Sequence, residues 1–204
     1  TYDLLMAMGM TLILILGGID LSVGSVLGLA GVVTTLSLSQ NVAGGGTTPI
    51  PVAIIMGLGV AALCGAFNGL LVARLKIAPF IVTLGMMAIA RGLGTVLTQG
   101  WYVSGLPEAY LQLGQGSFLS IPYPIYLTLL ILIVFNYLLK HWQPLYQAFY
   151  IGHNPDAAAL SGLRVSLVTF SGYVISSVLA GVAAIFMTSR LAMGFFQFGL
   201  GNEL

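Results

Sequence analysis

Few side chains in this sequence could take part in chemistry. Its 204 residues include six Lys or Arg, five Asp or Glu, two His and one Cys. His141 and His153 lack the spacing of a metal site, and neither G-x-S-x-G nor H-E-x-x-H occurs. The sequence has no G-x-x-x-x-G-K-[ST], which excludes a P-loop ATP site of its own, and Cys64 alone forms no disulfide framework. We therefore expect no catalytic residues, no cofactor and no metal ion on this chain.

Asp20 and Arg91 are ionisable residues at positions that the sequence predicts to lie at membrane depth. Asp20 belongs to a glycine-rich interruption at 17–24, which predicts a tight hairpin or a break in helices at membrane depth. Either Asp20 or Ser22 caps the following helix, or these polar groups line a water-filled path, since irregular backbone survives in a membrane only there or within protein. Arg91 lies about 18 Å into its apolar segment, where an ionised side chain must face protein or water. The candidates for this path or break are Gly17, Gly18, Asp20, Ser22, Gly24, Asn68 and Arg91.

A polar motif at 154–163 predicts a short helix outside the apolar segments. Asn154 is a good N-cap, Pro155 suits the first helical position, and Asp156 complements the positive end of the helix dipole. Three alanines then favour helix, and Gly162 is a natural stop. Lys140 and Arg164 flank the motif. We expect a helix of about two turns at 3.6 residues per turn, which either docks into a partner protein or only connects two spans.

The elements that must position these residues are membrane helices. Hydrophobic residues form 58% of the chain and charged residues 5%, whereas a soluble domain carries about 25% charged residues. Continuous apolar runs also disfavour a β-barrel, and a net charge of +1 argues against nucleic-acid binding. The fold class is therefore an all-α, polytopic transmembrane bundle with five or six spans. The apolar segments are 2–19, 24–40, 50–73, 79–98, 122–139 and 165–190.

Basic residues in the short loops orient the bundle. The loop after 73 carries Arg74 and Lys76, and the loop at 140–164 also contains basic residues, so both should be cytoplasmic. The loops at 41–49 and 99–121 have no Lys or Arg and should face outward, whereas Arg190 is an exception at the outer end of the last span. Small residues predict close helix packing along two spans. These residues are Gly57, Ala61, Gly65 and Gly69 in one span, and Gly172, Ser176, Ala180, Ala184 and Thr188 in the other.

Three stretches carry a family resemblance: GGIDLSVGSV at 17–26, the sequence NGLLVARLKIAPFIVTLGMMAIARGLG at 68–94, and IGHNPDAAALSGL at 151–163. In this order they resemble the inner-membrane permeases of bacterial ATP-binding-cassette importers for ribose, xylose, arabinose, galactose and related sugars. The resemblance implies a multi-pass protein of the bacterial inner membrane with about ten spans. On that reading 1–204 is a single permease domain with both ends missing, and 140–164 is a cytoplasmic loop with a coupling helix.

The resemblance also implies partners. These are a cytoplasmic ATPase that holds the ATP and Mg²⁺, a second permease subunit, identical or different, and a periplasmic sugar-binding protein. The residues expected to couple to the ATPase are Asn154, Pro155, Asp156, Ala157, Ala158, Gly162, Leu163 and Arg164. We expect the loop at 99–121, with Trp101, Tyr102 and Tyr110, to help dock the binding protein. We also expect Asn68 and Asn136 to donate hydrogen bonds between helices.

Two other functions remain open. An ion- or proton-driven secondary transporter usually needs several intramembrane carboxylates, and Asp20 is the single candidate here. An intramembrane enzyme would need a nucleophile paired with a base, and the sequence offers no such pair.

Overall fold

The computed structural model describes residues 1–42 and 46–201, so residues 43–45 of the expected outward loop lie outside the described residues. In this part of the chain nine α-helices and one short hairpin form, which confirms the all-α fold class. The elements are α1 (Tyr2–Ile15), α2 (Val23–Leu38), α3 (Ile50–Ala73), α4 (Pro79–Thr98), α5 (Glu108–Gln115), β1 (Ser117–Phe118), β2 (Ile121–Pro122), α6 (Tyr123–His141), α7 (Gln143–His153), α8 (Pro155–Leu160) and α9 (Val165–Leu191).

Among the described residues four helices, α3, α4, α6 and α9, are long and apolar enough to cross a membrane. Helices α1 and α2 are apolar but shorter than the predicted spans 2–19 and 24–40, because the chain is non-helical between Ile15 and Val23. With 14 and 16 residues they span about 21 and 24 Å, less than the hydrocarbon thickness of about 30 Å. A break at 17–22 between two such short helices supports the prediction of a break at membrane depth.

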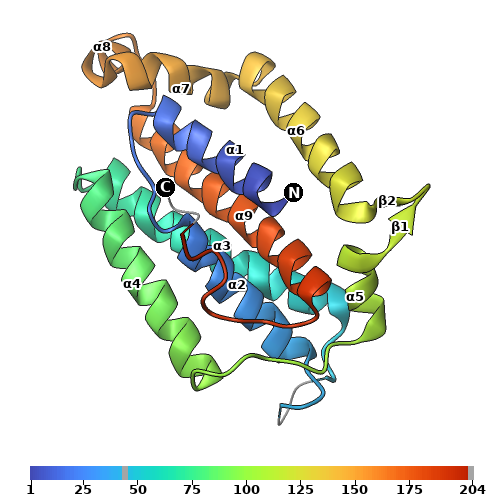
Figure 1. Ribbon diagram of the computed structural model, residues 1–204. Helices are drawn as coiled ribbons and strands as arrows, with labels where there is room; N and C mark the ends of the chain where they lie inside the picture. Colours follow the sequence, from blue (N-terminus) through green and yellow to red (C-terminus); the bar gives the residue numbers. More distant parts are fainter. Residues whose placement is uncertain (43–45, 202–204) are drawn as a thin grey trace.

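The centre of the bundle is formed by α2, α3 and α9, with α1 on the other side of α9 (Figure 1). Nearly every residue of α2 is buried. The predicted small-residue face of α3 is buried and lies against its neighbours: a Cβ at Gly57 would clash with Thr34 of α2, and one at Gly65 would lie 2.6 Å from the Tyr173 carbonyl oxygen of α9. Small side chains thus let these helix backbones approach closely, as the sequence predicts.

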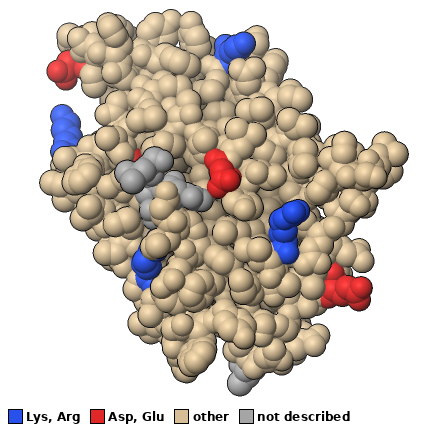
Figure 2. Space-filling model, in the orientation of Figure 1, with Lys and Arg blue, Asp and Glu red and all other residues tan. Residues whose placement is uncertain are grey.

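The bundle has two chemically different ends. We call the end with α7, α8 and the turn at 74–78 the α8 end, and the end with α5 and the hairpin the α5 end (Figure 1). The α8 end contains Arg74, Lys76, Lys140 and Arg164. Charged residues are sparse on the face seen in Figure 2, and large uncharged areas separate them. The positive-inside rule predicts that the α8 end is the cytoplasmic one.

After α9 the chain turns back into the bundle. Gly194 forms a two-way backbone bridge with Val103, at 2.8 and 2.9 Å, and the segment then runs along α2 (Figure 1). A Cβ at Gly28 of α2 would lie 2.6 Å from the Phe196 carbonyl oxygen. We call residues 194–201 the return segment.

Candidate functional site

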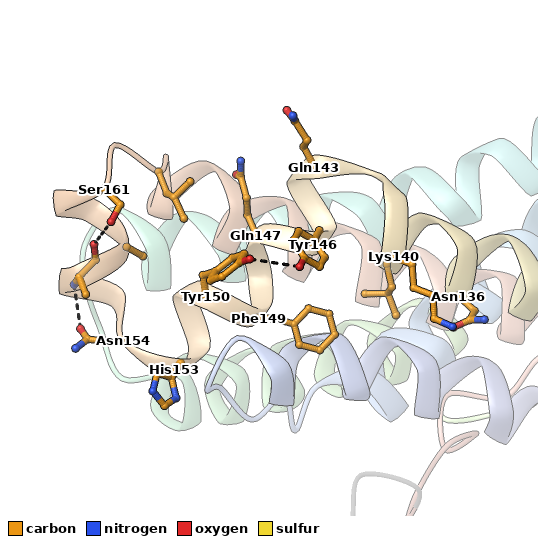
Figure 3. A pocket seen from close by; sticks show the side chains of 14 residues that line it. Asn136, Lys140, Gln143, Tyr146, Gln147, Phe149, Tyr150, His153, Asn154 and Ser161 are labelled. Carbon is orange, nitrogen blue, oxygen red and sulfur yellow. Dashed lines mark hydrogen bonds between the residues drawn. The ribbon is translucent and has the colours of Figure 1, made fainter.

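Helix α8 forms as the sequence predicts. The Asn154 Oδ1 accepts a hydrogen bond from the Ala157 N–H at 3.0 Å, and Pro155 occupies the first turn. The Ser161 hydroxyl donates to the Ala157 carbonyl at 2.9 Å, and Gly162 follows with a φ of +83°. Figure 3 shows both hydrogen bonds. Because both ends of this six-residue helix find hydrogen-bond partners, its exposed face is held in a fixed position.

The two faces of α8 differ sharply. Ala158 is only 5% exposed and belongs to the same buried cluster as Ala148 and Ile151 of α7, which corrects its expected place on the contact face. Ala157 and Ala159 are exposed, and Leu160 is 92% exposed. Among the described residues Leu160 is the most exposed large hydrophobic side chain, and it lies at the end of an ordered helix.

A groove lies on each side of α8. The larger, about 1140 Å³, is lined by α6, α7 and α8 and includes Lys140, Tyr146 and His153 (Figure 3). The smaller, about 770 Å³, is lined by the end of α3 and the start of α9, with Arg74 and Arg164. Helix α8 is therefore a ridge between two grooves with basic residues in their walls. Asn136, expected to bond between helices, is instead exposed and lines the larger groove.

The break between α1 and α2 is held by a buried hydrogen-bond chain. Asp20 is fully buried, and its Oδ1 accepts from the Ser22 N–H at 2.9 Å and from the Ser22 hydroxyl at 2.6 Å. The Asn68 side-chain amide of α3 donates to the Ser22 Oγ at 3.0 Å, which confirms the interhelical bond predicted for Asn68. Asp20 therefore stabilises the turn before α2, but neither Asp20 nor the N-cap residue Ser22 makes a side-chain capping bond to the first turn of that helix among the described residues, so the capping alternative is wrong.

Other buried polar atoms at the break have no hydrogen-bond partner among the described residues. They are the second carboxylate oxygen of Asp20, the Asn68 Oδ1 and the Tyr173 hydroxyl. A Cβ at Gly18 would lie 2.7 Å from the Tyr173 Oη, so this α9 hydroxyl faces the break. Water or a polar ligand could satisfy such groups, and the role of this region in a path stays a prediction.

At the α5 end, Tyr110 is buried rather than available for docking. Its hydroxyl lies 2.6 Å from the Thr188 Oγ1 of α9, and burial raises the pKa of Tyr110 to about 12. The prediction that Tyr110 contacts an outside partner is therefore wrong, because this ring anchors α5 to α9. Trp101 and Tyr102 are 73% and 58% exposed and remain candidates.

Comparison with known proteins identifies the family to which the chain belongs. Residues 2–204 match the family described as the permease component of the branched-chain amino acid transport system. The chain belongs to this family of transport permeases. Relatives of the permease include the ribose import permease protein of Bacillus subtilis (strain 168), 39% identical over 92% of this chain and 57% of the relative. The L-arabinose ABC transporter permease protein of Azospirillum brasilense is 33% identical over 97% of this chain and 57% of that protein.

A third relative of the permease, the galactofuranose transporter permease protein of Escherichia coli (strain K12), is 36% identical over 92% of this chain and 53% of its own length. The description of the family thus refers to the transport of amino acids, whereas the names of these relatives refer to sugars. The chain spans less than two thirds of the length of these curated relatives. No solved structure matches it.

The residues proposed for a path fall into two groups in the permease. Asp20, Ser22 and Asn68 lie together, whereas Arg91 lies further along α4. The Thr83 hydroxyl donates to the Ile19 carbonyl at 3.3 Å, which sets the break level with the first turns of α4. Arg91 is eight residues beyond Thr83, or about 12 Å along the axis. The break and Arg91 are therefore separate polar features at different depths.

Three features of the permease were missed by reasoning from the sequence. Helix α7 lies in a stretch read as loop, although Leu145, Ala148 and Ile151 are buried at three-residue spacing. Leu160 was not singled out, although it lies two residues, or about 200°, around the helix from the buried Ala158. The return segment has no periodicity by which it could be recognised.

Proposed function

We propose that this permease is the membrane subunit of an ATP-driven importer that moves a small sugar across the bacterial inner membrane by alternating access. The observation that carries the proposal is the ordered ridge of α8 with its 92% exposed Leu160 between two grooves. The chain contains no P-loop, so ATP and Mg²⁺ bind to a separate ATPase subunit, which contacts this ridge. The names of the sugar permeases to which the chain is similar support the substrate class.

The contacts of α8 suggest how the ATPase drives the bundle. Ala158 packs in the buried cluster with α7, and the Leu163 N–H donates to the Ala158 carbonyl at 3.1 Å just before α9 begins. A push on Leu160 and Ala159 is therefore delivered to α7 and α9 together. Since packed helices move as rigid bodies, the expected response is a tilt of these helices rather than local bending of α8.

Two further partners complete the proposal. A periplasmic sugar-binding protein docks at the α5 end, where Trp101 and Tyr102 are exposed. A second permease subunit, identical or different, pairs with this one so that the sugar passes between or through the two bundles. The permease itself holds no cofactor.

One observation favours a second candidate, an ion- or proton-coupled secondary transporter. The buried Asp20 has a carboxylate oxygen with no hydrogen-bond partner among the described residues, as a cation or proton site would require. The two functions differ in their energy source. Uptake that continues when the ATPase is removed, and that collapses with the ion gradient, would favour the secondary transporter.

Cross-linking tests the coupling directly. In a variant whose other cysteines are replaced, Cys64 among them, Leu160→Cys should form a cross-link to the ATPase subunit that changes with nucleotide. Ala158→Cys is the matched control on the same helix, because that side chain is buried and should not react. If Leu160→Cys can be labelled from the cytoplasm yet never cross-links, α8 is a connecting helix and the importer proposal fails.

A further inference from the structure

The return segment lies where irregular backbone is rare. It begins beside Thr35, near the α5 end of α2, and reaches Gly24, because a Cβ at Gly194 would clash with Thr35 and one at Gly199 would lie 2.5 Å from the Gly24 carbonyl oxygen. From Thr35 to Gly24 is eleven helical residues, or about 16 Å along the axis. The segment therefore enters the bundle from the α5 end and reaches about half the membrane thickness of about 30 Å.

The backbone of this segment is held by isolated turns. The Phe198 N–H donates to the Phe195 carbonyl, and the Leu200 N–H donates to the Gln197 carbonyl, each at 3.1 Å. Neither bond belongs to a helix or a sheet. At membrane depth such backbone is tolerated only when it is buried in protein or lines a water-filled cavity.

The exposure of each residue shows which parts of the segment are buried in protein and which parts could line a water-filled cavity. Gly194 and Gly199 are buried against α2, whereas Gln197 between them is exposed. Phenylalanines flank Gln197 in the sequence, and the ring centroid of Phe195 lies 4.8 Å from that of Phe196 and 6.0 Å from that of Phe198. A glutamine amide has two donors and a carbonyl acceptor, and exposing it to lipid would be costly. At Gln197 the return segment therefore calls for a polar environment.

Helix α4 adds a second polar group on the same side. A Cβ at Gly94 would lie 2.9 Å from the Phe196 Cβ, so this face of α4 contacts the return segment. Arg91 lies one turn before Gly94 on that helix and is half-buried. Ionisable residues at this depth face the interior of a bundle or a water-filled path.

We propose that the return segment forms one wall of the sugar's path from the α5 end, and that the Gln197 amide hydrogen-bonds to the sugar hydroxyls beside the Phe195 and Phe196 rings. This inference rests on the proposed function. A few directed polar groups among aromatic rings are the usual composition of a small-molecule site. Gly28, Gly94 and Gly199 position this wall, because a side chain at any of them would push the return segment away from α2 or α4.

Accessibility of single cysteines tests whether the segment faces water. In the assembled importer, with Cys64 and any other cysteines replaced, Gln197→Cys should react with a charged, membrane-impermeant thiol reagent, and a saturating transported sugar should slow the reaction. Ile133→Cys on the apolar face of α6 is 66% exposed and is the lipid-facing control, which should not react. When the sugar-binding protein is left out, Trp101→Cys should react at the same rate with and without sugar. A Gln197→Cys variant as unreactive as Ile133→Cys, or reactive but unprotected by sugar, would overturn the inference.

Uptake kinetics separate this inference from the proposed function. Gln197→Leu should raise the KM for sugar uptake roughly tenfold, whereas Gln197→Asn, which keeps the amide, should lose less. The Leu160→Cys cross-link to the ATPase should be unchanged in both variants, which would show that they fold and assemble. An unchanged KM in Gln197→Leu would refute the path assignment alone. Failure of the unmodified importer to move any sugar would refute the proposed function itself.

Discussion

The close packing of α3 on α9 can be tested with two glycines of the same helix. At Gly65 a Cβ would lie 2.6 Å from the Tyr173 carbonyl oxygen and 2.7 Å from the Ser177 Oγ, whereas at Gly59 it would meet nothing within 4 Å. Ala at either site gains the same helix propensity. The difference in stability between Gly65→Ala and Gly59→Ala therefore isolates the steric cost of separating α3 from α9.

The geometry sets the size of that cost. An ordinary carbon contact is about 3.5–4.0 Å, so α9 must move by about 1 Å to accept the methyl group at Gly65. The Ser177 hydroxyl can rotate away, but the Tyr173 carbonyl belongs to the helix backbone and cannot. Overpacking of this kind costs about 1–3 kcal/mol. For a protein of this size each kcal/mol corresponds to about 2–4 °C in Tm.

Thermal unfolding of the purified permease in one detergent measures the difference. We expect Gly65→Ala to unfold several degrees below Gly59→Ala, and Gly59→Ala to match or exceed the unsubstituted protein. Equal Tm values for the two variants would mean that α3 and α9 do not approach as closely as the structure has them. The argument for the small-residue face would then fail.

Three further predictions concern the α8 end. Leu160→Asp should abolish most sugar uptake in cells while leaving the Tm unchanged, because the side chain is exposed, and a large fall in Tm would contradict its role in docking. Asn154→Ala removes the cap on the Ala157 N–H and should destabilise α8 by about 0.5–2 kcal/mol, seen as faster hydrogen exchange at 155–160; unchanged exchange would show that the cap is dispensable. Gly152→Ala should reduce uptake but preserve the Leu160→Cys cross-link, because a Cβ there would overlap the Ile15 carbonyl oxygen; normal uptake would show that α7 moves freely past α1.

The sequence predicted the parts of this site that depend on near neighbours. The limits of α8 follow from Asn154, Pro155 and Gly162, since caps act within three or four residues of the chain. Which residues of α8 are buried and which are exposed could not be predicted from these neighbouring residues. Ala158 is buried because α7 lies beside it, and the sequence alone predicts a loop where α7 forms.

The burial of Tyr110 could not be predicted either, because it depends on a contact with a residue far away in the sequence. Its hydroxyl meets Thr188, 78 residues away, and no local pattern around Tyr110 signals that contact. A tyrosine in an outward loop is as compatible with a docking surface as with an anchor. Only the packing of α5 on α9 decides between them.

A chain of contacts connects α8 to the break and to the proposed sugar path. Helix α8 packs on α7 through Ala158, and α7 reaches α1 at Gly152, where the backbone abuts the carbonyl of Ile15. In the sequence the break comes directly after α1, and the hydrogen bonds of Asp20 to Ser22 stabilise the turn into α2. Helix α2 in turn supports the return segment at Gly28. Because Ala158 is buried and Gly152 abuts the Ile15 backbone, a shift imposed at Leu160 is transmitted through α7 to α1 and so to the break. An importer whose ATPase acts at one end and whose substrate enters at the other needs a connection of this kind, and a connecting helix with no partner would not.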